Sequence, residues 1–147
     1  MKAVKTLVLL ANDENARLVQ NVGVGHGLTE VGTLAASDFA DVDAEYADQK
    51  GRSQGSPGMA HHAVEPSTSI ERQERQAFAR HVLAEAQTQF AKGYDRFALV
   101  AAPRMLGELR DHLPKTLKGA LLFDLAKDLV HTSERDLPKA LADKAAF

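Results

Sequence analysis

The sequence predicts a mixed α/β fold in which helices cover the faces of a five-stranded sheet. Three observations support this class. Five short apolar runs, each bounded by turn residues, are typical of strands. The first three runs are joined by short links, whereas helical patterns precede both of the last two. A long segment between the third and fourth runs carries apolar residues at helical spacing, which indicates an amphipathic helix.

The first three strands are predicted over residues 6–11, 16–22 and 28–34. Their short connections favour an antiparallel meander. The second connection contains residues 23–27, Gly-Val-Gly-His-Gly. These alternating glycines lack the GxGxxG spacing of a dinucleotide-binding loop and precede a strand, so they indicate a hairpin turn instead of a phosphate site.

The best-marked helix follows a long loop predicted over about residues 37–69, in which a short helix over 41–49 is one alternative. Thr68 and Glu71 stand at capping-box spacing at its start, and Gly93 provides a left-handed cap at its end. Its apolar stripe repeats every four residues. The members of that stripe are Phe78, Val82, Ala86 and Phe90.

The remaining elements alternate between strand and helix. Residues 97–102 are almost all apolar, as expected of a central strand that is covered on both faces, and residues 120–125 indicate another buried strand. A helix over 103–113 lies between them. The last helix is predicted to begin after Asp136, because Pro138 is tolerated only in a first helical turn.

Right-handed crossovers place the fourth strand beside the first and parallel to it, which gives the strand order 3-2-1-4-5. This is a ribonuclease H-like arrangement, and we expect residues 1–147 to form one domain. The hydrophobic content of 44% is sufficient for a packed core, and the absence of cysteine excludes disulfides and thiolate chemistry. The initial apolar run is too short for a signal peptide or a membrane span, so a cytoplasmic protein is expected, without membrane contact.

Three stretches carry a family resemblance: residues 101–110 (AAPRMLGELR), 127–129 (KDL), and 51–52 (GR) followed by 75–79 (RQAFA). Together they resemble the bacterial family known as host attachment protein, or protein required for attachment to host cells. That family in turn resembles the middle domain of archaeal and eukaryotic class-1 peptide release factors. The resemblance implies the same fold and contact with the translation machinery.

In release factors, a long loop before the helix carries Gly-Gly-Gln, which enters the peptidyl-transferase centre. This chain has Gly51-Arg52-Ser53-Gln54-Gly55 at the corresponding place. Because Gln54 lacks the paired preceding glycines, the hydrolytic role of that motif does not transfer to it.

Metal-dependent chemistry is not favoured. Two-metal hydrolysis of phosphodiesters needs carboxylates on the first and fourth strands of this fold, and residues 6–11 and 97–102 contain none. His61 and His62 are adjacent, so in an extended segment they point to opposite sides and do not readily share one ion. We therefore expect no metal and no cofactor.

Basic residues are the remaining binding candidates. Arg104 lies in the first turn of the helix that follows the central strand, where an α/β sheet commonly holds anionic groups. Arg72, Arg75 and Arg80 join it in one basic surface if the long loop folds back. The alternative is that these arginines pair with nearby glutamates. The predicted binding residues are Arg52, Arg104, Arg110 and Lys127.

The leading interpretation is a non-catalytic binding domain that engages RNA or ribosome-associated partners through Arg104 and the 51–62 loop. The net charge of −2 provides no global attraction to nucleic acid, so binding would depend on a local positive surface. One alternative is a hydrolase that uses Gln54, His61 or His62. Another is a homo-oligomeric attachment or stress factor without a small ligand.

Overall fold

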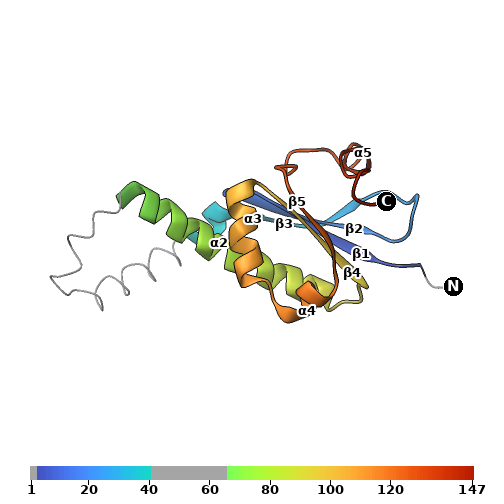
Figure 1. Cartoon of the computed structure of the whole chain (residues 1–147), viewed down its shortest axis with the longest axis horizontal. Helices are drawn as coiled ribbons and strands as arrows, with labels where there is room; N and C mark the ends of the chain where they lie inside the picture. Colours follow the sequence, from blue (N-terminus) through green and yellow to red (C-terminus); the bar gives the residue numbers. More distant parts are fainter. Residues whose placement is uncertain (1–2, 41–65) are drawn as a thin grey trace.

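The computed structural model describes residues 3–40 and 66–147, and Figure 1 shows the arrangement of their elements. One five-stranded sheet has the order β3-β2-β1-β4-β5. The first three strands are antiparallel neighbours, and β4 and β5 continue the sheet parallel to β1. The strands are β1 (Thr6–Ala11), β2 (Asn15–Asn21), β3 (Thr29–Ala35), β4 (Arg96–Ala101) and β5 (Leu121–Ala126).

Helices lie on both faces of the sheet (Figure 1). Because side chains alternate along a strand, Leu7 and Leu9 of β1 pack toward one face, and Val8 and Leu10 toward the other. The first face is covered by α2 and α3, and the second by α5 and the end of the chain. The helices are η1 (Ala36–Phe39), α2 (Pro66–Phe90), α3 (Pro103–His112), α4 (Lys115–Gly119) and α5 (Leu137–Ala140).

The predicted fold class and strand order are confirmed, and the arrangement is ribonuclease H-like. The central strand β4 is buried along nearly its whole length, as its continuous apolar sequence predicts. In α2, Phe78, Val82 and Ala86 are buried in the core. Gly93 has a φ of +124° just beyond this helix, which confirms the expected left-handed turn.

Three expectations are corrected. The helix α2 begins at Pro66, so Thr68 lies inside its first turn and does not occupy the cap position. The strand β5 is not buried, because it forms the outer edge of the sheet and has no further strand beside it. The predicted loop also contains η1 at its start and the first turn of α2 at its end. The suggested helix over 41–49 lies outside the described residues.

Both outer strands carry one extra residue relative to their neighbours. In β3, Val31 is skipped in the pairing with β2, and in β5, Leu122 is skipped in the pairing with β4. The backbone N–H of Glu30 donates to the carboxylate of Glu134 at 2.9 Å. The hydrogen-bonding ladders between β2 and β3 and between β4 and β5 are therefore each interrupted once.

The glycine-rich turn between β2 and β3 also holds the last residue of the sequence. Gly25 and Gly27 adopt positive φ values of +89° and +72°, and their N–H groups both donate to the backbone oxygen of Phe147 at 3.1 Å. The Phe147 side chain is buried in the same core cluster as Leu10.

Within the described ranges, no helix is long and apolar enough to cross a membrane.

Candidate functional site

The candidate site lies where the parallel strands β1, β4 and β5 end. After β4 the chain enters α3 on one face of the sheet, whereas after β5 it continues to the opposite face toward α5. In open α/β sheets, a crevice forms at the carboxyl ends of strands whose connections diverge in this way, and ligands commonly bind there. The residues that follow the three strands are Asn12 and Asp13, Pro103 and Arg104, and Lys127 and Asp128.

Asn12 links the turns that follow β1 and β5 by hydrogen bonds. Its side-chain Nδ2 donates to Oδ2 of Asp128 at 3.1 Å. Its Oδ1 accepts hydrogen bonds from the backbone N–H groups of Glu14 and Asn15, at 2.9 and 2.7 Å. The other carboxylate oxygen of Asp128 accepts from the backbone of Val130. Asp128 therefore orders the turn after β5, and its hydrogen bonds indicate a structural role.

Asp13, the next residue after Asn12, forms an ion pair with Arg75 of α2. The Nε atom of Arg75 lies 3.3 and 3.2 Å from the two carboxylate oxygens of Asp13. Arg75 is only 9% exposed, so it is part of the interior and does not contribute to a basic surface. Arg72 of α2 lies 3.8 Å from the carboxylate of Glu108 on α3. The alternative that these arginines pair with nearby acids therefore holds for Arg75, whereas Arg72, whose side chain is 68% exposed, stays a candidate member of a basic surface.

Arg110, in the last turn of α3, is held by the edge strand. Its Nε and Nη2 atoms donate to the two carboxylate oxygens of Asp124 on β5, at 3.0 and 2.7 Å. These hydrogen bonds hold the pKa of Asp124 below its usual range and raise the pKa of Arg110, while partial burial acts in the opposite direction for each. The charge of Arg110 is therefore largely neutralised within the fold.

Arg104 differs from these arginines. It is exposed in the first turn of α3, and its side chain makes no hydrogen bond or ion pair with any described residue. Pro103 occupies the start of the helix, and among the described residues no side chain caps it. The free N–H groups of a helix start carry a partial positive charge, which adds to that of the guanidinium.

The other predicted site residues are only partly placed by the structure. Lys127 is exposed just after β5, and Arg104 lies just after β4, so both are at the carboxyl ends of the parallel strands. Arg80 is exposed on α2. Four further predicted residues lie outside the described part of the chain: Arg52, Gln54, His61 and His62.

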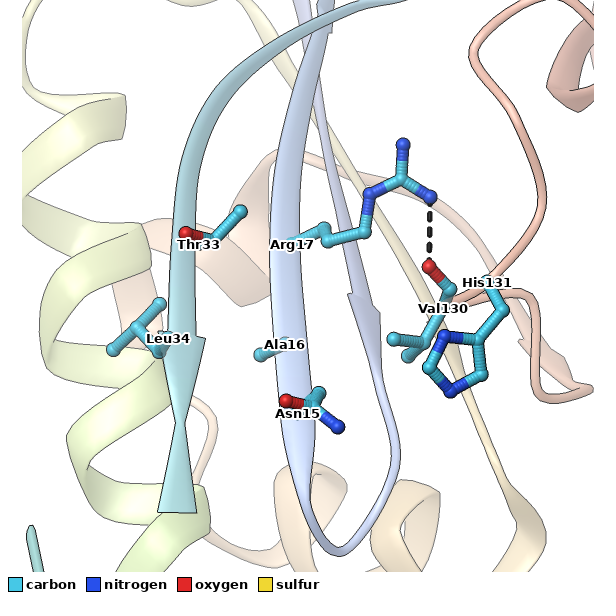
Figure 2. A pocket seen from close by; sticks show the side chains of 7 residues that line it. All are labelled: Asn15, Ala16, Arg17, Thr33, Leu34, Val130 and His131. Carbon is cyan, nitrogen blue, oxygen red and sulfur yellow. Dashed lines mark hydrogen bonds between the residues drawn. The ribbon is translucent and has the colours of Figure 1, made fainter. Parts of the chain in front are cut away.

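A shallow pocket of about 220 Å³ lies between β2, β3 and the segment after β5 (Figure 2). Sequence reasoning did not single out its basic residue, Arg17. That guanidinium donates to the backbone oxygens of Val130 and Thr132, at 2.8 and 2.6 Å, and pairs with Glu30 at 2.9 Å. Arg17 therefore ties the segment after β5 to the sheet. The pocket is lined by Asn15, Ala16, Arg17, Thr33, Leu34, Val130 and His131.

Within residues 3–40 and 70–147, no three acidic or histidine side chains converge in a way that would hold a metal ion. The strands β1 and β4 carry no acid, and the carboxylate of Asp13, two residues after β1, is paired with Arg75. Among the described residues, Arg104 and Lys127 are exposed basic side chains that follow β4 and β5.

Comparison with known families agrees with this architecture. The family model described as bacterial archaeo-eukaryotic release factor family 12 matches residues 5–141. The chain belongs to this family. No curated protein matches the chain. The match to release factor family 12 spans all five strands and the helices α2 to α5 in sequence, so it includes the whole candidate site. It confirms the resemblance to release factors, while the resemblance to host attachment proteins stays a prediction.

Proposed function

We propose that this protein is a non-catalytic binding domain that engages RNA or ribosome-associated partners, with Arg104 as a principal contact. Membership of release factor family 12 supports a role connected with translation, because release factors act on the ribosome. The loop over residues 51–62, with Arg52, is a second proposed contact, and it lies outside the described residues.

One observation carries the proposal. Three arginines of the described chain make hydrogen-bonded ion pairs with acids: Arg17, Arg75 and Arg110. Arg104 is exposed, has no such partner among the described residues, and lies at the edge of the sheet where anionic ligands commonly bind. A guanidinium in this position can donate two parallel hydrogen bonds to a phosphate.

The charge of the whole chain sets the expected strength of binding. A net charge of −2 gives no long-range attraction to a polyanion, so few phosphates will be contacted. The affinity should fall as the salt concentration rises, but only gently. In a plot of the logarithm of the binding constant against the logarithm of the salt concentration, each neutralised phosphate adds about 0.7–0.9 to the steepness of the slope.

The test is co-sedimentation of the full chain with purified bacterial ribosomes across a salt series. Arg104→Glu should weaken binding and reduce its dependence on salt. The matched control is Arg96→Glu, because Arg96 is exposed at the opposite end of β4. The proposal is contradicted if the wild-type protein stays in the soluble fraction at low salt, or if the two variants weaken binding equally.

A further inference from the structure

Gly107 occupies the middle of α3, where glycine is an unfavourable residue. Glycine loses more backbone freedom than alanine on entering a helix, so it destabilises helix interiors. A helical glycine in such a position therefore needs a reason, such as an unusual backbone angle, a close neighbour or a function.

The described fold gives no internal reason for this glycine. Its backbone is not in the left-handed region, unlike that of Gly93. A Cβ atom built on Gly107 would meet no atom within 4 Å, whereas one built on Gly23 would lie 3.2 Å from the ring of His26. Alanine would fit at position 107 without displacing any described residue.

Gly107 lies at the centre of the exposed face of α3. The buried side of this helix is formed by Met105, Leu106, Glu108 and Leu109. Arg104 precedes Gly107 by almost one turn on the exposed side, and Arg110 follows it by almost one turn. The missing side chain thus leaves a flat surface between the two guanidinium groups.

The charge on this face is asymmetric. At the start of the helix, Arg104 has no acidic partner among the described residues, and the helix dipole is positive. At the other end, Asp124 neutralises Arg110, and Asp111 adds an exposed negative charge. A polyanion is therefore attracted to the first half of α3, up to the surface around Gly107.

We propose that Gly107 is the point at which an RNA backbone approaches α3 most closely, while Arg104 contacts a phosphate one turn earlier. The proposal rests on the proposed function for the choice of RNA as partner. It adds a specific contact point, and it explains why a residue that weakens the helix occupies an open position.

The experiment compares Gly107→Ala with Gly119→Ala in the full chain. Gly119 is also an exposed helical glycine whose Cβ would meet nothing within 4 Å, but it lies at the end of α4. Thermal unfolding and binding are measured for both variants. The binding probes are purified bacterial ribosomes and protein-free ribosomal RNA, at low and moderate salt.

Gly107→Ala should raise the melting temperature by a few degrees and weaken binding to both probes by about tenfold, the loss typical of one contact. Gly119→Ala should bind as the wild-type protein does. These opposite effects of one methyl group on stability and binding separate a contact residue from a structural one.

Four outcomes overturn the inference. A lower melting temperature for Gly107→Ala would mean that the fold itself requires the glycine. Wild-type affinity of Gly107→Ala, together with weakened binding of Arg104→Glu, would reject the contact point and leave the proposed function intact. If Gly107→Ala loses binding to ribosomes but keeps its binding to protein-free ribosomal RNA, the partner at this surface is a ribosomal protein and not RNA. If the wild-type protein binds neither probe, the proposed function fails and this inference fails with it.

Discussion

The side chain of Asn12 donates a hydrogen bond to the carboxylate of Asp128, 3.1 Å away, although 116 residues separate them. This bond joins the turn after β1 to the turn after β5, past the end of β4, which lies between those strands. The two residues therefore stabilise the end of the sheet at which the parallel strands finish, and Arg104 lies at this end.

Replacing Asn12 with alanine should lower the free energy of unfolding by about 1–2 kcal/mol, because two backbone N–H groups and Asp128 lose their partner. Urea denaturation measures the change. Asn15→Ala is the control, since no hydrogen bond joins the Asn15 side chain to another described residue. Equal effects of the two substitutions would contradict the structural role of Asn12.

The ion pair between Arg75 and Asp13 should show energetic coupling. Asp13→Asn leaves a nearly buried guanidinium without its counter-charge and should cost about 1–2 kcal/mol. Arg75→Met removes that charge and retains an apolar stem, so the double variant should be less destabilised than the sum of the single changes. A double-mutant cycle by chemical denaturation checks this, and simple additivity would show that the pair contributes nothing.

The pair formed by Arg110 and Asp124 should make stability depend on pH at the acidic end. The pKa of Asp124 is lowered in the folded state, so its contribution is present above the unfolded pKa of about 3.9 and is lost as pH falls through the folded value. Asp124→Asn should cost about 0.5 kcal/mol at pH 7, because the pair is partly exposed. Urea unfolding of both proteins should show this difference shrinking as the pH falls below the unfolded pKa; a constant difference would rule out the ion pair as its source.

Phe147 should contribute substantially to the stability of the hydrophobic cluster on the α5 face of the sheet. Its side chain is 8% exposed and packs beside Phe123, so Phe147→Ala should lower the free energy of unfolding by about 2–3 kcal/mol. Val24→Ala in the adjoining turn is the control, since Val24 is 76% exposed. Thermal unfolding of the two variants measures the difference, and equal melting temperatures would mean that the packing of Phe147 adds no stability.

The sequence predicts local elements well, because their signals are local. The continuous apolar run of β4, followed by Pro103 and Arg104, is sufficient to predict a central strand, a helix start and an arginine at the sheet edge. The helix α4 was missed, since five residues are too few to show a periodic pattern. The exposure of β5 was mispredicted because apolar composition alone does not distinguish an edge strand from a central one.

The ion pairs of the candidate site could not be predicted in the same way. Arg75 and Asp13 are 62 residues apart, and only the packing of α2 against the sheet brings them together. Whether an arginine of this chain is paired or available is decided by such long-range contacts. For this reason the sequence identifies a set of basic candidates, and the structure shows which of the described ones are paired with acids.

The extra residues Val31 and Leu122, one in each outer strand, bear on how this protein behaves at high concentration. A regular edge strand offers a row of unpaired backbone groups to which a strand from another molecule can add, the first step of many aggregation reactions. A bulge twists the edge and breaks that row, and the carboxylate of Glu134 occupies one donor of β3. Deleting Val31 or Leu122 would leave a more regular outer strand, and we expect such a variant to aggregate more readily at high concentration.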